Sequence, residues 1–318
     1  MRQPVLTALF LTLLCLTLDC VAASGRVFVT NEKSDSVSVI DIKTNQVVKT
    51  IPIGKRPRGV GLAPDGSAVY VAVSGENHIA VIDPHTLELK GSFASGDDPE
   101  AFAVHQNGNI YISNENDAKA SVFDPHTGKL VAEIEVGIEP EGVAISPDGT
   151  RAIVTSESTN MLHIIAIPEH TVVNSILVGA RPRSATFSAD GKTAYATSEI
   201  GGEVKKVDVA SGTILGKMAL SDDQAKPKDI VVSRDGKRLY VAGGRANRVF
   251  VLDANTLDVI TSVAVGKRVW GLAQSRDGGR LYTTDGVDNQ VSVIDTKSNS
   301  VVTKIPVGEA PWGIAIDD

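Results

Sequence analysis

The sequence predicts an all-β fold, a seven-bladed β-propeller in which each blade is a four-stranded antiparallel sheet. Three observations predict it. One short motif recurs seven times, each period contains four strand-like runs, and the two ends of the chain supply complementary strands. A repeat of about 42 residues with four strands in each unit is typical of propeller blades.

The recurring motif is Gly-x-x-Pro-x-Gly, either complete or degraded. Its proline position falls at Pro57, Pro99, Pro140, Pro182, Pro227, Val269 and Pro311, in steps of 42, 41, 42, 45, 42 and 42 residues. An apolar and mostly aromatic position keeps the same spacing, at Phe28, Tyr70, Tyr111, Ile153, Tyr195, Tyr240 and Tyr282. A fixed period of this size predicts a repeat architecture before any single residue is considered.

Four β-type runs fill each period. In the first complete unit they are residues 59–63, 68–73, 78–83 and 88–95, which are rich in Val, Ile, Tyr and Phe. A tight-turn signal, Pro64-Asp65-Gly66, separates the first two runs, and Asp83-Pro84-His85-Thr86 separates the last two. These hairpin signals favour propeller blades over a solenoid, whose repeats contain helices or parallel strands.

The two ends of the chain belong to one blade. The chain ends with residues 313–317, which have the pattern of the first strand of a blade and nothing more. It begins, after the leader, with residues 26–30, which have the pattern of a second strand. We therefore expect the C-terminal strand to pair with the N-terminal one, so that the ring closes without an open sheet edge.

Several runs resemble the YVTN-type β-propeller repeat, among them residues 27–31, 36–41, 47–54 and 142–149, and the resemblance covers the whole mature chain. Related propellers include surface-layer proteins, lactonases, the haem d1 domain of nitrite reductases and the heavy chain of quinoprotein amine dehydrogenase. The chain is most similar to the propeller proteins that accompany pyrroloquinoline-quinone (PQQ)-dependent alcohol catabolism in Gram-negative bacteria. That resemblance implies a functional link to PQQ, with a periplasmic quinoprotein dehydrogenase or cytochrome c as partner.

The N-terminus predicts export. Arg2 precedes an apolar stretch from residue 5 to residue 18, and Val21-Ala22-Ala23 offers a signal-peptidase site. We expect a signal peptide at 1–23, a single propeller domain at 24–318 and a periplasmic monomer without stable membrane insertion. A lipoprotein attached through Cys20 is the alternative. Both cysteines lie in the leader, so the mature chain has no thiol or disulfide chemistry.

Composition and motifs argue against several function classes. The net charge of −7 with 4% aromatic residues does not suit a nucleic-acid-binding protein. Six histidines are scattered over different repeats, and no phosphate loop, haem-attachment motif or nucleophile elbow is present. We therefore expect no metal site and assign no catalytic residue.

The candidate site is the mouth of the central channel, where the loops that carry the recurring motif gather. The residue after each proline position is expected to face this opening, and these residues are Arg58, Glu100, Glu141, Arg183, Lys228, Trp270 and Trp312. Five are charged, and the other two are the only tryptophans in the chain. The same face is expected to receive Glu32, Glu115, Glu157 and Glu199 from the connections between second and third strands.

Alternatives remain open for this ring of residues. The charges can pair with one another while the tryptophans pack against neighbouring blades, which is a structural role. They can equally form a docking surface for a polar ligand or a protein partner. A catalytic carboxylate pair of Glu100 and Glu141 is a third hypothesis.

From the sequence we expect an exported, non-enzymatic binding protein associated with periplasmic quinoprotein alcohol oxidation. No bound cofactor is assigned beyond the implied link to PQQ. An enzyme of the lactonase type or a haem d1-handling protein is the first alternative. An interaction module of the cell envelope is the second.

Overall fold

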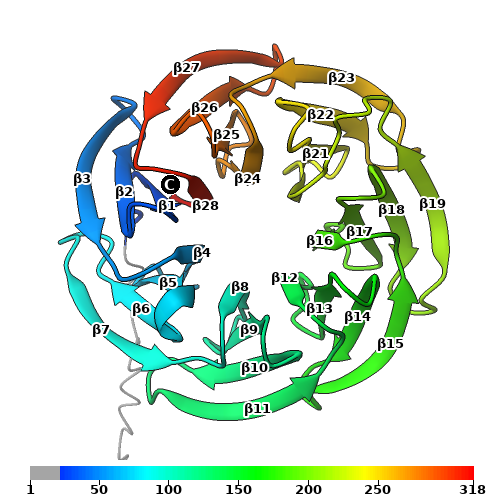
Figure 1. The fold of residues 1–318 in the computed structure, drawn as a ribbon, viewed down its shortest axis with the longest axis horizontal. Coiled ribbons are helices and arrows are strands. Elements are labelled where there is room, and N and C mark those ends of the chain that lie inside the picture. Colours follow the sequence, from blue (N-terminus) through cyan, green and yellow to red (C-terminus); the bar gives the residue numbers. More distant parts are fainter. Residues whose placement is uncertain (1–21) are drawn as a thin grey trace, which may run out of the picture.

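Seven β-sheets of four strands each form a closed ring, which Figure 1 shows along its axis. The computed structural model describes residues 22–318, and every count given below refers to this range. The arrangement confirms the predicted seven-bladed β-propeller. The expected signal peptide at 1–23 lies almost wholly outside the described residues, so the cleavage site and the domain boundary stay predictions. Among residues 22–318 we find no helical segment with the length and apolar character that a bilayer crossing needs.

The four strands of each blade run outward from the central channel. The innermost strands are β4 (Pro57–Leu62), β8 (Pro99–Val104), β12 (Pro140–Ile145), β16 (Pro182–Phe187), β20 (Ile230–Val232), β24 (Val269–Gln274) and β28 (Pro311–Asp317). The second strands are β1 (Arg26–Asn31), β5 (Val69–Val73), β9 (Ile110–Asn114), β13 (Arg151–Ser156), β17 (Thr193–Ser198), β21 (Arg238–Ala242) and β25 (Arg280–Asp285).

The outer half of each blade is as regular. The third strands are β2 (Ser36–Asp41), β6 (His78–Ile82), β10 (Lys119–Asp124), β14 (Met161–Ala166), β18 (Glu203–Asp208), β22 (Arg248–Asp253) and β26 (Gln290–Asp295). The outermost strands are β3 (Gln46–Pro52), β7 (Leu89–Ala94), β11 (Lys129–Glu135), β15 (Thr171–Leu177), β19 (Ile214–Ala219), β23 (Val259–Ala264) and β27 (Ser300–Pro306). One 3₁₀ turn, η1 (Ser74–Glu76), follows β5.

The hydrophobic core is divided among the interfaces between neighbouring blades and does not form one central cluster. Seven clusters of buried side chains occur, and each joins two neighbouring sheets. Second strands such as β5 and β9 are buried along their whole length, because both of their faces are covered by adjacent blades. The apolar position that marks each repeat in the sequence therefore packs at a blade interface, as Phe28 and Tyr111 do.

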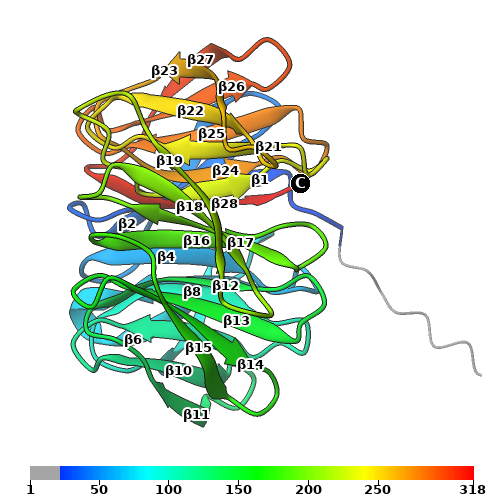
Figure 2. The same cartoon turned by 90° about the vertical axis from the view of Figure 1, so that its right-hand side faces the viewer.

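The ring closes through one composite blade. Strand β28 pairs antiparallel with β1, with Val27 opposite Ile316 and Val29 opposite Ile314, as the sequence predicts. The blade therefore has the order β28-β1-β2-β3. The backbone nitrogen of Ser24 also donates a hydrogen bond to Asp317 Oδ2 at 2.8 Å. This contact joins the two ends of the described chain, and Figure 2 shows the C-terminus beside β1 on one face of the disc.

His163 is the most deeply buried histidine of the described chain, on β14. Its Nε2 accepts the backbone N–H of Gly137 at 2.9 Å, which leaves the ring proton on Nδ1, 2.9 Å from Ser175 Oγ. Burial disfavours the charged ring and lowers the pKa of His163 to about 4. The histidines are not all isolated, because His105 and His170 flank Tyr111, whose hydroxyl lies 3.1 Å from His170 Nδ1.

Removing residues 313–318 should destabilise the ring. The truncation deletes most of β28 and removes the apolar contacts of Ile314 and Ile316, at up to about 1.5–3 kcal/mol each, while exposing the edge of β1. We expect a clearly lower melting temperature or aggregation, measured by thermal unfolding against a control that lacks only Asp318. An unchanged melting temperature for the longer truncation would show that the two ends do not close the ring.

Replacing His163 with Gln should remove one source of acid sensitivity. Because the pKa of folded His163 lies below the ordinary value, the unfolded chain binds the extra proton first. The stabilising effect of the neutral ring is thus present above about pH 6.5 and is lost as the pH falls toward 4. Between pH 7 and pH 4 the wild-type protein should lose about 3 kcal/mol more unfolding free energy than H163Q. If urea titrations showed that both proteins lose the same unfolding free energy between pH 7 and pH 4, His163 would not be a source of acid sensitivity.

Candidate functional site

A β-bulge aims the candidate residues into the channel. In six innermost strands the pairing register shifts just after the proline position, for example between Pro57 and Val60 and between Pro140 and Val143. A bulge inserts an extra residue and redirects a side chain. The redirected residue is the one after the proline position, such as Arg58 or Glu141, as expected from the repeat. In six blades the residue just before the proline position has a left-handed backbone conformation. These residues are Arg56, Asp98, Glu139, Arg181, Arg268 and Ala310.

Buried hydroxyl groups hold these bulges. Thr155 Oγ1 accepts the backbone N–H of Gly142 in its own blade at 2.8 Å and donates to the carbonyl of Arg183 in the next blade at 3.2 Å. The same bridge between blades occurs at five second strands, formed by Thr30, Ser113, Thr155, Thr197 and Thr284. Each donates to the carbonyl of a mouth residue, so the hydroxyl groups fix the backbone from which those side chains project.

One half of the mouth is organised around Glu100, whose side chain is fully buried. Its two carboxylate oxygens lie 3.0 Å from Arg56 Nη2 and 2.6 Å from Arg58 Nη1. Arg58 also donates to Glu32 at 3.1 Å, and Arg56 donates to Asp98 at 3.0 Å. The carboxylates of Asp98, Glu100 and Glu115 cluster within 4.8 Å, but each of the three is already paired with the guanidinium group of Arg56 or Arg58.

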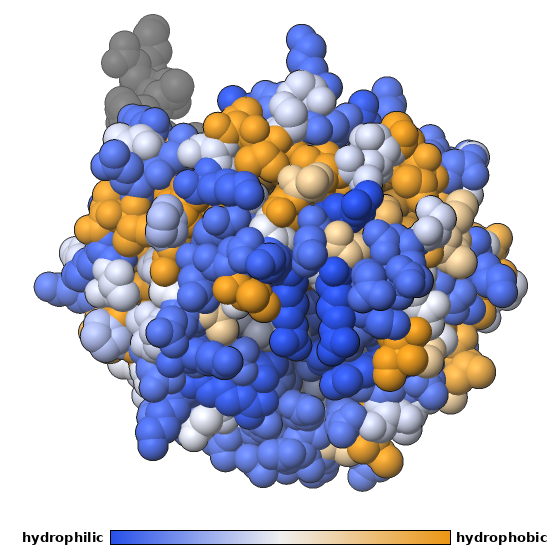
Figure 3. Space-filling view, turned by 45° about the horizontal axis from the view of Figure 1, so that its top comes forward, coloured by the Kyte–Doolittle hydropathy of each residue, from blue (hydrophilic) through white to orange (hydrophobic). Residues whose placement is uncertain are grey.

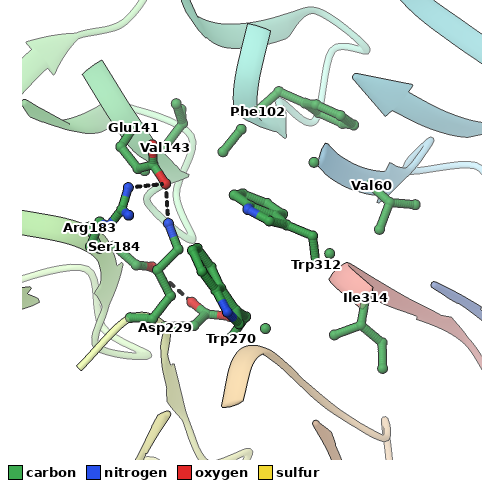
Figure 4. A pocket seen from close by; sticks show the side chains of 16 residues that line it. Val60, Phe102, Glu141, Val143, Arg183, Ser184, Asp229, Trp270, Trp312 and Ile314 are labelled. Atoms are coloured by element: carbon green, nitrogen blue, oxygen red, sulfur yellow. Dashed lines mark hydrogen bonds and ion pairs between the residues drawn. The ribbon is translucent and has the colours of Figure 1, made fainter. Parts of the chain in front are cut away.

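The other half is organised around Arg183 and Glu141, both buried. Arg183 Nη1 lies 3.0 Å from Glu141, and Arg183 Nε donates to Glu199 at 2.7 Å. Arg183 also pairs with Glu157, and the ammonium group of Lys228 pairs with Glu141. Figure 4 shows the two cations converging on the Glu141 carboxylate. The ion pairs thus join side chains from different blades. Glu141 and Lys228, for example, lie 87 positions apart in the chain.

The two tryptophans meet at the same place. Their ring centroids lie 6.3 Å apart with the planes tilted by 35°. The ammonium nitrogen of Lys228 is 4.9 Å from each centroid, so this cation is held between two indole rings and one carboxylate. Arg58 lies over Trp312 at 5.4 Å, and Arg268 lies over Trp270 at 4.8 Å.

The surroundings of Glu100 and Glu141 shift the pKa values of these two carboxyl groups in opposite directions. Burial and the neighbouring charge of Glu141 raise the pKa of Glu100. Burial also disfavours the charged form of Glu141, but attraction to Lys228, Arg183 and Arg58 outweighs it and lowers the pKa of Glu141 to about 2. Burial and repulsion from Arg183 lower the pKa of Lys228. Glu141 therefore carries its negative charge at any ordinary pH and anchors the cations around it.

The side chains of Glu141, Arg183, Trp270 and Trp312 lie between two cavities and line both of them, and we call these side chains the floor. Above the floor is an outer cavity of about 370 Å³, which we call the funnel. Below it is an inner chamber of about 150 Å³ inside the channel, and both cavities touch Glu141, Arg183, Trp270 and Trp312. Figure 4 shows Val60, Phe102 and Ile314 on the apolar side of the chamber, opposite Glu141, Ser184 and Asp229. Figure 3, an oblique view of the molecule, shows that most residues in the middle of the view are hydrophilic.

All seven sequence-predicted residues lie around this floor, joined by the ion pairs and stacking contacts given above. Whether they bind a ligand stays a prediction. Sequence reasoning missed Arg56, Arg181 and Arg268, which line the funnel from the position before the proline. It also missed Asp229, the single acid at a motif position that is Gly, Ala or Ser in the other blades. Asp229 accepts hydrogen bonds from Ser184 Oγ at 2.9 Å and from the backbone N–H of Leu272 at 2.9 Å.

Two family models match the chain. The model of the choice-of-anchor I domain matches residues 92–298, and the model of YNCE-like β-propellers matches residues 7–102. A curated relative, antigen Lp49 of Leptospira interrogans, is 28% identical over 94 residues. That match covers 25% of this chain and only 21% of the relative.

Solved structures share the fold at low sequence identity. A functionally unknown protein from Desulfotomaculum acetoxidans superposes with a TM-score of 0.81 at 18% identity, covering 92% of this chain and 98% of that one. Hydrazine synthase of Kuenenia stuttgartiensis gives 0.74 at 22% identity, with coverage of 81% and 88%. The dihydro-haem d1 dehydrogenase NirN, solved in complex with DHE, gives 0.72 at 15% identity, with coverage of 93% and 76%. At these identities the likeness shows the fold alone.

Replacing Thr155 with Val should test the hydroxyl bridges. The substitution keeps the shape but leaves the Gly142 N–H and the Arg183 carbonyl without this partner, in a site that is 0% exposed. We expect a loss of about 1–3 kcal/mol in unfolding free energy, measured by chemical denaturation. Thr155→Ser keeps the hydroxyl and is the matched control, with a much smaller loss. Equal losses for both variants would mean that the methyl packing matters and the bridge does not.

Proposed function

Because the chain belongs to the choice-of-anchor I domain family and forms a single propeller ring, we propose that it is a binding protein whose funnel receives a polar ligand or a protein partner. The observation that carries the proposal is the floor of the funnel. Two indole rings and several cations are held in fixed positions at the bottom of an open cavity. The few residues that dominate the binding energy of protein interfaces are enriched in Trp, Tyr and Arg.

Binding is favoured over acid-base catalysis by the contacts of the two buried carboxylates. Both oxygens of Glu100 are occupied by guanidinium groups, and Arg183 and Lys228 both contact Oε1 of Glu141. A general acid or base needs a free oxygen within reach of the reacting atom and a pKa near the working pH. Glu100 lacks the free oxygen, and a pKa of about 2 makes Glu141 too weak a base. These carboxylates serve better as anchors for the cations. Enzymatic alternatives of the lactonase or haem d1 type would place the chemistry elsewhere in the funnel.

The physiological setting follows from the resemblance of the repeats and the predicted leader. We place the protein in the periplasm, as an accessory to PQQ-dependent alcohol oxidation, with a quinoprotein dehydrogenase or cytochrome c as the partner. The predicted cleavage before Ser24 and the similarity to propellers that accompany this catabolism support this part of the proposal.

The tryptophan pair should be required for binding. Replacing both Trp270 and Trp312 with Ala removes the aromatic floor and should weaken partner binding by at least about 2 kcal/mol, which is about thirtyfold. Calorimetric titration with a quinoprotein alcohol dehydrogenase, with cytochrome c and with PQQ would measure the change. Circular dichroism would show whether the ring stays folded.

The matched control is the double variant Leu215→Ala with Ile260→Ala, which removes two exposed apolar side chains from the outermost strands. It should bind like the wild-type protein. A partner that binds the wild type and the tryptophan variant equally well would rule out the funnel as the binding site.

A further inference from the structure

Asp229 lines the inner chamber, and no cation of the described chain pairs with its carboxylate. The ion pairs beside it are balanced, three carboxylates against three cations. They are formed by Glu141, Glu157 and Glu199 with Arg181, Arg183 and Lys228. Within residues 22–318, the partners of the Asp229 carboxylate are the Ser184 hydroxyl and the backbone N–H groups of Ile230 and Leu272. Only neutral donors therefore stabilise its negative charge.

The chain departs from its own repeat to place this carboxylate. The equivalent positions of the other six blades carry only Gly, Ala or Ser, namely Gly59, Ala101, Gly142, Ser184, Gly271 and Gly313. A Cβ atom at Gly142 would lie 2.6 Å from the Arg183 carbonyl oxygen of the next blade, so a regular blade leaves little room there. In the blade of Asp229, the preceding loop carries the longest interval of the repeat, and β20 pairs with β21 without a bulge. This irregular start gives the carboxylate its space.

The chamber sets an apolar wall opposite this charge. Figure 4 shows Asp229 on one side and Val60, Phe102 and Ile314 on the other. Burial raises the pKa of Asp229, and the hydrogen bonds that the carboxylate accepts offset this effect only in part. Buried charges in proteins are ordinarily paired with an opposite charge. A volume of about 150 Å³ is below the range of drug-sized ligands, so it suits a cation of only a few heavy atoms.

We propose that the inner chamber binds a small primary alkylammonium ion. Its ammonium group donates hydrogen bonds to the carboxylate of Asp229 and to Ser184 Oγ, and its alkyl chain packs on the apolar wall. Lys228 does not supply this cation, because its ammonium group is held by Glu141 and the two indole rings. The three N–H donors of a primary ammonium group suit the oxygens of the polar wall. The alkyl chain gains free energy on leaving water, which favours this ligand over a bare monovalent cation.

The probe that tests the proposal is n-propylammonium, titrated into the full mature chain at constant ionic strength and followed by ligand-observed NMR. The molecule 1-propanol has the same alkyl chain without the charge, and tetramethylammonium has the charge without an N–H donor. We expect propylammonium to bind in the millimolar range and the other two to bind at least about tenfold more weakly. Equal binding of either one, or no binding of propylammonium at tens of millimolar, would overturn the proposal. Displacement by an equal concentration of potassium would do so too, because it would indicate a bare-cation site.

Two variants locate the ligand. Asp229→Asn removes the charge with little change of shape and should weaken propylammonium binding at least about tenfold. Asp235→Asn removes the same charge from an exposed turn of the same blade and is the matched control, with unchanged affinity. Val60→Phe fills the chamber from its apolar side, leaves Asp229 in place and should abolish binding.

Circular dichroism shows which variants are folded, so that either chamber variant can decide the question if the other does not fold. Unchanged affinity in a folded chamber variant would overturn the proposal, as would equal losses in the two aspartate variants. The chamber ligand and the funnel partner are tested separately. A partner whose binding requires the tryptophan pair would support the funnel as a binding site even if propylammonium failed to bind.

Discussion

The pairing of β28 with β1 is the constraint on which the rest of the structure depends. Each of the seven apolar clusters lies between two blades, so every blade needs a neighbour on both sides. The closing strand also carries Trp312, which reaches Trp270 on one side and Arg58 on the other. Closure of the ring and assembly of the funnel floor are therefore one event, and the candidate site forms only in the complete ring.

The charged residues of the mouth are better explained by specificity than by stability. Burying an ion pair such as Arg183 with Glu141 costs desolvation energy that the attraction between the charges only partly returns. An apolar plug would close the channel at lower cost. The buried carboxylates instead hold guanidinium and ammonium groups in fixed positions, and the hydroxyl bridges fix the backbone beneath them. Such order is useful when a ligand must be recognised, because little entropy is lost on binding.

The sequence predicted the architecture well because a propeller is built from local signals repeated at one spacing. The blade number, the composite blade and the position that faces the mouth all follow from the period. Contacts between blades are not local. The place of Lys228 between two indoles depends on side-chain directions across the ring, and no spacing reveals it. The bulge also brings the residue before the proline to the funnel, which strand alternation alone does not indicate. Thr or Ser recurs two residues after the aromatic mark in five repeats, and this signal was available in the sequence.

The two ends of the described chain lie together on the face opposite the funnel. Arg26 pairs with Asp317 at that face, whereas Asn31 pairs with Pro311 at the mouth. Anything joined to either end, such as an affinity tag, a fluorescent protein or a lipid, would leave the disc on the side away from the cavity. A protein attached to a sensor chip through one of its ends would thus present its funnel to the solution. If the chain were tethered to a bilayer in the same way, its opening would face outward from the membrane surface.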